Sequence, residues 1–236
     1  LDYLLTNSLN QFKEFKTINE NTGFSILGKK DGKLDINALT KKINIKYKLR
    51  GEITHFSNIY NIDAALIPLI KGDKTYYMTI TGKNKDSFLI HQIDDLTKRV
   101  YNIFYNKKEN EFEFSKISKI YGESWDRFSD FFRGYEHYKK FESSKAIKYF
   151  LKSDNLLISK YLLADLFYFL ENNVESLKKI DEIMPYIDDL TEYLRLKVLA
   201  LRARLNLNFK EEIGNLEKLK NSYSFSKEVF YELGEA

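Results

Sequence analysis

The spacing of apolar residues changes twice along this chain of 236 residues. In residues 1–15, leucine and phenylalanine recur at three- and four-residue intervals, which predicts an amphipathic helix. Residues 24–27 form a short apolar run that predicts a strand, and the polar residues 28–33 predict a loop. Asp35 is a suitable N-cap for a second helix, which ends near residue 42.

The period then becomes two. In residues 45–53, apolar and charged residues alternate, which predicts a half-buried strand. Residues 59–70 predict a second, more apolar strand, in which Pro68 indicates an edge or a bulge near the end. A turn at residues 71–74 leads to a third strand over residues 75–81. Because the turns are short, these three strands should form an antiparallel meander.

Helical spacing returns after the third strand. Asp86 is predicted to cap a long helix over residues 87–105. Its buried stripe comprises Leu89, Ile93, Leu96, Val100, Ile103 and Phe104. We therefore predict an α+β fold with an N-terminal α/β domain (residues 1–107), a linker (108–123) and an all-α domain (124–236).

The composition is that of a folded chain with balanced charge. Hydrophobic residues make up 43% and aromatic residues 15%, which argues against disorder. The 38 basic and 34 acidic residues give a net charge of +4, and Lys and Glu alternate along the predicted helices. Without one clustered basic patch, we expect no nucleic-acid partner. No apolar run reaches the roughly 18 residues of a membrane span, so we expect no transmembrane segment.

No residue pattern indicates catalysis. The chain has no cysteine, which excludes disulfides, zinc–thiolate sites and cysteine nucleophiles. The histidines, His55, His91 and His137, lack the spacing of a metal site or an acid–base pair. Phosphate-loop, dinucleotide-binding and nucleophile-elbow motifs are also absent from the sequence. We therefore expect a protein that is not an enzyme and has no catalytic residues, cofactor or metal site.

The N-terminal domain resembles the TolB N-terminal-like and CsgG-like α/β family of bacterial envelope proteins. The likeness lies in Tyr47-Lys48-Leu49-Arg50-Gly51-Glu52-Ile53, Ile62-Asp63-Ala64-Ala65-Leu66-Ile67, Gly72-Asp73-Lys74 and the helix that contains Phe88 to Leu96. In that family, two strands, a glycine-containing turn and a third strand precede a long helix packed across the sheet. The family usually opens with a further strand, which we expect to be missing or to lie upstream of residue 1.

The C-terminal domain resembles tetratricopeptide (TPR) helical hairpins, whose unit is about 34 residues. Small residues mark the crossing of two helices and a large one fills the gap, as in Gly134, Ala146 and Phe150. The helix-crossing positions are Gly134, Ala164, Ala200 and Gly234, 30, 36 and 34 residues apart. Ser176 and Ile180 take the second-helix positions of the second repeat. The third repeat has Glu212 where a small residue belongs, followed by Leu216 and Leu219.

This resemblance implies a concave groove lined by the first helix of each hairpin. Carried over by position, the groove residues are Phe131, Tyr135, Tyr138, Tyr161, Asp165, Tyr168, Lys197 and Arg204. Tyrosine suits such a surface because it buries a large area and keeps a polar tip. The alternative is that these aromatic side chains pack between helices. An aromatic groove that ends in basic residues would bind an amphipathic or acidic peptide.

The two resemblances together imply a protein–protein interaction scaffold in a bacterial periplasmic or envelope assembly. A secretion or flagellar-motor structure is one instance of that class. The alternative is a regulatory or sensor module of a cytoplasmic signalling protein, which binds partner peptides through the same groove. A signal peptide or lipobox upstream would favour the first hypothesis, and a DNA-binding or cyclase domain would favour the second.

Overall fold

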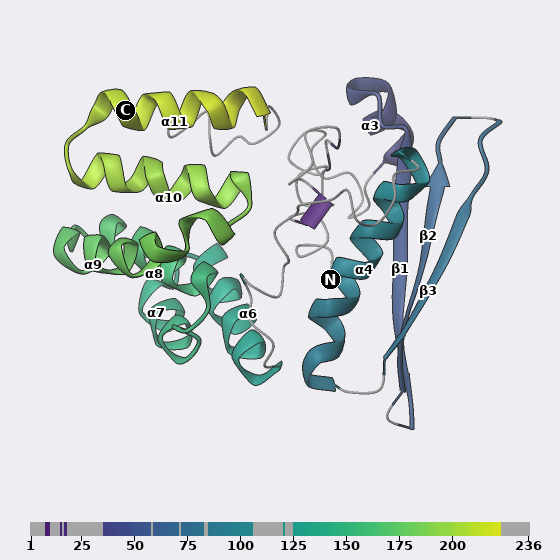
Figure 1. Ribbon diagram of the computed structural model, residues 1–236, viewed down its shortest axis with the longest axis horizontal. Helices are drawn as coiled ribbons and strands as arrows, with labels where there is room; N and C mark the ends of the chain where they lie inside the picture. The colour runs from purple at the N-terminus through teal and green to yellow at the C-terminus, as the bar shows by residue number, and fades with distance from the viewer. Residues whose placement is uncertain are drawn as a thin grey trace. The chain divides into compact units, whose positions relative to one another are not determined.

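The computed structural model describes residues 8, 9, 15, 17, 35–57, 59–70, 72–82, 85–105, 120 and 125–222. These residues fall into two compact units, one built around a sheet up to residue 105 and one helical from residue 120 onward. The fold is therefore α+β with a helical C-terminal part (Figure 1). Most of the predicted first helix, the predicted strand at 24–27, the loop at 28–33 and most of the predicted linker lie outside the described residues. The same holds for residues 223–236, which include Gly234.

Helix α3, Ile36–Ile43, is fixed at both ends by local hydrogen bonds. The Asp35 carboxylate accepts a bond of 3.0 Å from the amide of Ala38, which confirms Asp35 as the N-cap. At the other end, Asn44 takes the left-handed conformation, with φ of 52°, and its amide donates to the carbonyl of Thr40.

The three predicted strands form an antiparallel meander in the order β1-β2-β3. They are β1 (Tyr47–Phe56), β2 (Ile59–Pro68) and β3 (Tyr76–Gly82). Pro68 is the last residue of β2 and faces Tyr47 at the start of β1. A proline at this place removes no hydrogen bond from the middle of the sheet.

Helix α4, Lys85–Tyr105, lies across one face of the sheet (Figure 1). The helix begins at Lys85, so the prediction that Asp86 precedes it as a cap is wrong, and Asp86 lies in the first turn. The core between helix and sheet consists of Ile62, Ala64, Leu66, Met78 and Ile80 from the strands and Ile93, Leu96 and Val100 from α4. The core residues are every second residue of the strands and every third or fourth residue of α4, which are the two spacings of apolar residues in the sequence.

The opposite face of the sheet carries polar side chains that are linked by cross-strand hydrogen bonds. The Thr79 hydroxyl donates to Asp63 at 2.6 Å, and the Thr81 hydroxyl donates to Asn61 at 2.8 Å. Such cross-strand pairs stabilise a solvated sheet face by a few tenths of a kcal/mol to about 1 kcal/mol each.

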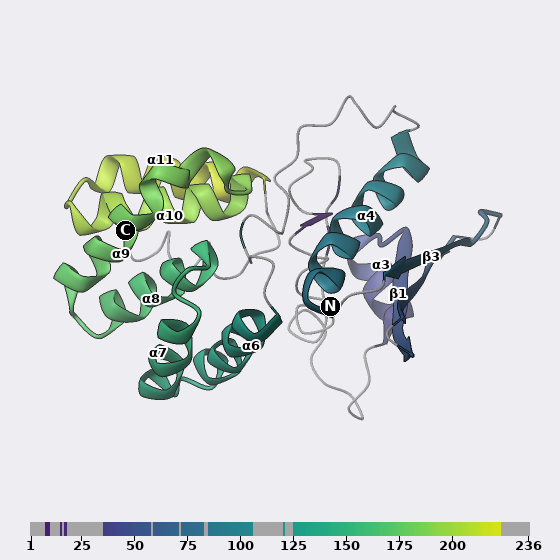
Figure 2. The same ribbon diagram turned by 60° about the horizontal axis from the view of Figure 1, so that its bottom comes forward.

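The described residues of the helical unit form three helix pairs, each packed as a hairpin, that follow one another along the chain (Figure 2). The pairs are α6 (Trp125–Lys139) with α7 (Ser143–Lys152), α8 (Leu157–Phe169) with α9 (Asn173–Ile183), and α10 (Glu192–Leu205) with α11 (Phe209–Ser222). A 3₁₀ helix, η2 (Met184–Asp189), joins the second pair to the third. None of the described helices is long and apolar enough to cross a membrane.

The three hairpins close through the same turn. Its middle residue is left-handed each time, with φ of 58° at Phe141, 60° at Glu171 and 58° at Leu207. The amide of the next residue donates to the carbonyl five positions back in all three turns. By their numbers, the three left-handed residues are 30 and 36 positions apart, the separations of the small crossing residues. The longer interval contains the six residues of η2.

Small residues allow the helices of each pair to approach closely. A Cβ on Gly134 would lie 2.7 Å from the Phe150 ring, which is fully buried. Ala146 is also fully buried, as predicted. At the second crossing, the buried Ser176 hydroxyl donates to the carbonyl of Ala164 at 2.7 Å.

Candidate functional site

The predicted groove residues occupy three repeat positions relative to the crossing residues Gly134, Ala164 and Ala200. The first position lies three residues before the crossing residue. It is occupied by Phe131, Tyr161 and Lys197, whose exposed fractions are 0%, 6% and 5%. Their side chains lie inside the unit, so the prediction that they face a free groove is wrong.

Tyr161 and Lys197 are buried because their helices, α8 and α10, are enclosed on several sides. Helix α8 reads Leu-Ile-Ser-Lys-Tyr-Leu-Leu-Ala-Asp-Leu-Phe-Tyr-Phe, and most of it is buried. A helix that is apolar all round packs on all sides, whereas an amphipathic helix leaves one face in solvent. In α6, Phe131 belongs to an aromatic cluster with Phe128, Phe132 and Phe150.

The remaining five predicted groove residues are half-buried. They are Tyr135, Tyr138, Asp165, Tyr168 and Arg204, and we call them the first-helix row. Each lies one or four residues after its crossing residue, towards the end of a first helix.

The members of the row contact one another across successive hairpins. The Tyr138 hydroxyl donates to Asp165 at 2.6 Å, which links α6 to α8. The Arg204 guanidinium lies over the Tyr168 ring at 5.5 Å, which links α8 to α10. The Tyr135 and Tyr138 rings stack with centroids 6.3 Å apart. The row therefore runs through all three first helices.

Arg204 has a second partner that the sequence analysis did not foresee. Its Nε donates to Glu212, whose exposed fraction is 1%. Glu212 stands where the repeat pattern expects a small residue, and a buried carboxylate there is tolerable only when paired. Arg204 therefore holds the third hairpin together as well as contributing to the row.

A cluster of four charges lies beside the second hairpin, and the sequence analysis missed it. Lys179 contacts Asp154 at 2.8 Å and Glu182 at 3.2 Å, and Lys160 contacts the same two carboxylates. The three-residue spacing of Lys179 and Glu182 was the one local signal for the cluster. Because two lysines balance two acids, the cluster is a structural network.

Opposing effects set the two shifted pKa values of this cluster. Burial opposes the charge of Lys179, but its contacts with Asp154 and Glu182 outweigh burial and raise its pKa. Burial likewise opposes the charge of Glu182, and the two lysines outweigh it, so the pKa of Glu182 is lowered. Both shifts favour the charged, paired state.

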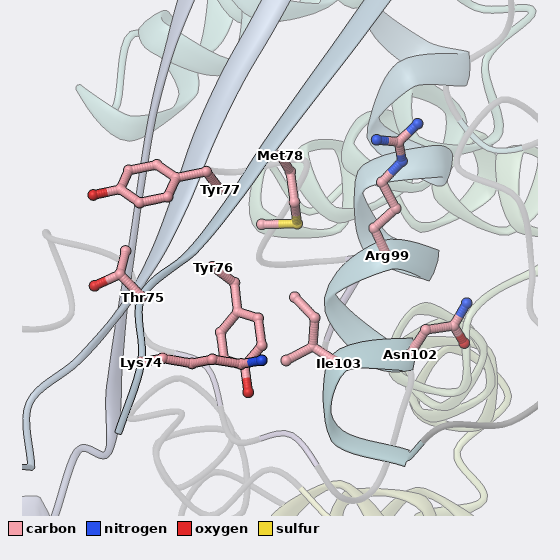
Figure 3. A pocket seen from close by; sticks show the side chains of 8 residues that line it. All are labelled: Lys74, Thr75, Tyr76, Tyr77, Met78, Arg99, Asn102 and Ile103. Atoms are coloured by element: carbon pink, nitrogen blue, oxygen red, sulfur yellow. The ribbon is translucent and has the colours of Figure 1, made fainter. Parts of the chain in front are cut away.

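In the described part of the sheet unit, a shallow hollow lies between β3 and α4 (Figure 3). Its lining includes Tyr76, Met78, Arg99 and Ile103. The Arg99 guanidinium is already engaged, because it donates to the carbonyl of Thr79 at 3.1 Å. Among the described residues, no group of three or more His, Asp or Glu side chains could hold a metal ion.

Comparisons with known proteins do not place this chain in a family. No family model matches it, and no solved structure matches it. A stretch of 90 residues is 32% identical to "Probable aminopeptidase 2" of Sulfurisphaera tokodaii. That stretch covers 36% of this chain and 11% of the curated protein, so the chain spans about a tenth of the relative that it matches.

Proposed function

We propose that this protein is a non-enzymatic interaction scaffold whose helical unit binds partner proteins through the first-helix row. The observation that carries the proposal is the half-buried series of tyrosine, aspartate and arginine side chains on three successive first helices. Tyr and Arg are the residues that most often anchor protein interfaces, because they combine a large contact area with a polar group.

The row favours a partner segment that is both apolar and acidic. The tyrosine rings offer apolar faces, and Lys139 lies over the Tyr135 ring at 5.1 Å at one end of the row. At the other end Arg204 lies over the Tyr168 ring, and its Nε is already bonded to Glu212, while Asp165 is engaged by Tyr138. An extended or amphipathic segment would complement this arrangement if its carboxylates share Lys139 with Glu136 and Arg204 with Glu212.

Two settings for such a scaffold remain proposals. The TolB-N-like and TPR-like resemblances support a place in a bacterial periplasmic or envelope assembly, for example around a secretion system or flagellar motor. A cytoplasmic sensor module would use the same row. The complete reading frame distinguishes them, because a signal peptide supports the first setting and an upstream DNA-binding or cyclase domain supports the second.

The central test removes two anchors without disturbing the turns. We expect the double variant Tyr135→Ala, Tyr168→Ala to remain folded and to lose the partner that the wild-type chain retains from native extract. Exposed Tyr186 in η2 lies outside the row, so Tyr186→Ala is the matched control and should retain the partner. The partner should then be purified and titrated against the wild type, the double variant and the control variant. Buried aromatic anchors typically contribute ~2 kcal/mol or more each, so the double variant should weaken binding by about 4 kcal/mol, which is roughly 1,000-fold. Equal affinity for wild type and double variant would refute the row as the binding surface.

A separate assay addresses the partial likeness to an aminopeptidase. We expect no release of p-nitroaniline from a panel of aminoacyl-p-nitroanilides, with or without added zinc, cobalt or manganese. Turnover that survives repurification and is abolished by chelation would contradict the non-enzymatic proposal.

A further inference from the structure

The two edges of the sheet differ in what they offer to another strand. The amide of Leu69 donates to the carbonyl of Lys46, so even-numbered residues of β1 bond to β2. The odd-numbered residues, including Leu49, Gly51 and Ile53, therefore direct their amides and carbonyls to the outer edge. On the opposite edge, Arg99 already occupies the carbonyl of Thr79 in β3.

The outer half of β1 is exposed although it is apolar in part. From Gly51 to Phe56 every residue is exposed, with 43% at Ile53 and 82% at Phe56. Ile53 faces the same side of the sheet as the buried Ile62, its partner in β2. A long, exposed edge strand with apolar residues is a template for pairing with another strand.

The charged residues of β1 lie on its other face. Lys48, Arg50 and Glu52 share this face because they alternate with the inward residues. Glu52 lies directly opposite Asp63 of β2. Like charges in that arrangement are destabilising, so a cation beside Glu52 would relieve the repulsion.

A second copy of β1 supplies such a cation in one antiparallel register. With Gly51 facing Gly51 of the partner subunit, Arg50 faces the partner subunit's Glu52, and by symmetry the pair forms twice. In the same register Leu49 faces Ile53 of the partner subunit, which continues the apolar side of the sheet. A shift by two residues would oppose two Arg50 or two Glu52 side chains. The outward amides and carbonyls of odd-numbered residues meet in this register, as antiparallel pairing requires.

We propose that two copies of this chain associate through β1, with a two-fold axis at Gly51, to form one continuous six-stranded antiparallel sheet. The interface is isologous, because the same strand contributes both sides. A glycine at the centre suits the close approach of two backbones.

The decisive experiment reverses the charges of the proposed pair in the full chain. Sedimentation equilibrium over a concentration series should show a monomer–dimer equilibrium for the wild type. Arg50→Glu and Glu52→Arg should each raise the dimer dissociation constant at least about tenfold, because each creates two like-charge pairs. An equimolar mixture of the two variants should form a heterodimer, and the double variant should recover the homodimer.

Lys48→Glu is the matched control. It makes the same change of charge on the same face, but Lys48 faces Thr54 of the partner subunit in this register. Its dissociation constant should stay close to that of the wild type. All variants should retain the far-ultraviolet circular dichroism spectrum of the wild type.

Cysteines test the register itself, since the chain has none of its own. In the variant Lys48→Cys, Thr54→Cys, each cysteine lies in a non-hydrogen-bonded pair with Cα atoms about 4.5 Å apart, within disulfide range. Oxidation should give a covalent dimer, whereas Lys48→Cys, Glu52→Cys should not. A wild-type chain that is monomeric throughout the series would overturn the proposal, as would a charge-reversed mixture that fails to pair. A monomeric wild type is the result expected if another segment of the chain pairs with the outer edge of β1.

Discussion

Gly134→Ala tests the close packing of the first hairpin by adding one methyl group. The new Cβ would lie 2.7 Å from two carbons of the Phe150 ring and 3.2 Å from the Tyr149 Cβ. Phe150 is fully buried and packs against the Phe131 and Tyr138 rings at 6.1 and 6.4 Å, so its ring has little room to move.

Two effects of opposite sign decide the outcome. Alanine is favoured over glycine in a helix by about 1 kcal/mol. Forcing an extra carbon into a packed core typically costs about 1–3 kcal/mol. Because the contact is far inside van der Waals range, we expect an overpacking cost in the upper part of that range, about 2–3 kcal/mol, and hence a net loss of roughly 1–2 kcal/mol of unfolding free energy.

The assay is urea denaturation followed by far-ultraviolet circular dichroism, with amide hydrogen exchange in α6 and α7 locating the effect. Gly214→Ala in α11 is the matched control, since a Cβ there meets no atom within 4 Å. It should stabilise the chain by up to about 1 kcal/mol. Phe150→Leu should recover part of the loss when combined with Gly134→Ala, which shows that the two sites are coupled. A Gly134→Ala chain as stable as the wild type would refute the close crossing.

The remaining predictions concern charged groups in the helical unit. Arg204→Met leaves Glu212 buried without its partner and should lower the unfolding free energy by about 3–5 kcal/mol, whereas adding Glu212→Leu should restore most of that loss. Urea unfolding of the single and the double variant measures both values. An equal loss in the two variants would contradict the pairing. For Glu182, the pKa is lowered from 4.5 in the folded chain, so its stabilising contribution is fully present above pH 4.5 and is lost as the pH falls through the lowered folded value. Glu182→Gln should therefore destabilise at neutral pH, and the difference from wild type should shrink in acid; a difference independent of pH would exclude this role.

Local rules account for the elements that the sequence analysis predicted correctly. The meander of β1, β2 and β3 follows from strict alternation and short turns, which need no information from distant residues. Asp35 caps α3 through a bond that spans three residues. The three hairpin turns are 30 and 36 residues apart, which is also the spacing of the small residues in the sequence. The two spacings agree because each turn closes by hydrogen bonds within its own helix pair.

Burial of the first helices was decided by packing between hairpins. Tyr161 and Tyr168 lie in the same helix, seven residues apart, and the sequence predicts the same groove position for both. Yet Tyr161 is buried and Tyr168 is half-buried. The difference arises because α8 is enclosed along its length and emerges towards its end, which depends on the helices before and after it. The apolar run of α8 was a signal for this enclosure, since a helix that faces solvent carries a polar stripe.

The pairing of charges likewise depended on the tertiary structure. Arg204 and Glu212 belong to different helices, and the cluster of Asp154, Lys160, Lys179 and Glu182 joins residues up to 28 positions apart by their numbers. Sequence alone determined which of these segments are helix and strand, because the side-chain period, the caps and the turn residues are local. Only the tertiary structure decided which side chains reach solvent and which charges meet, because both depend on how distant segments pack together.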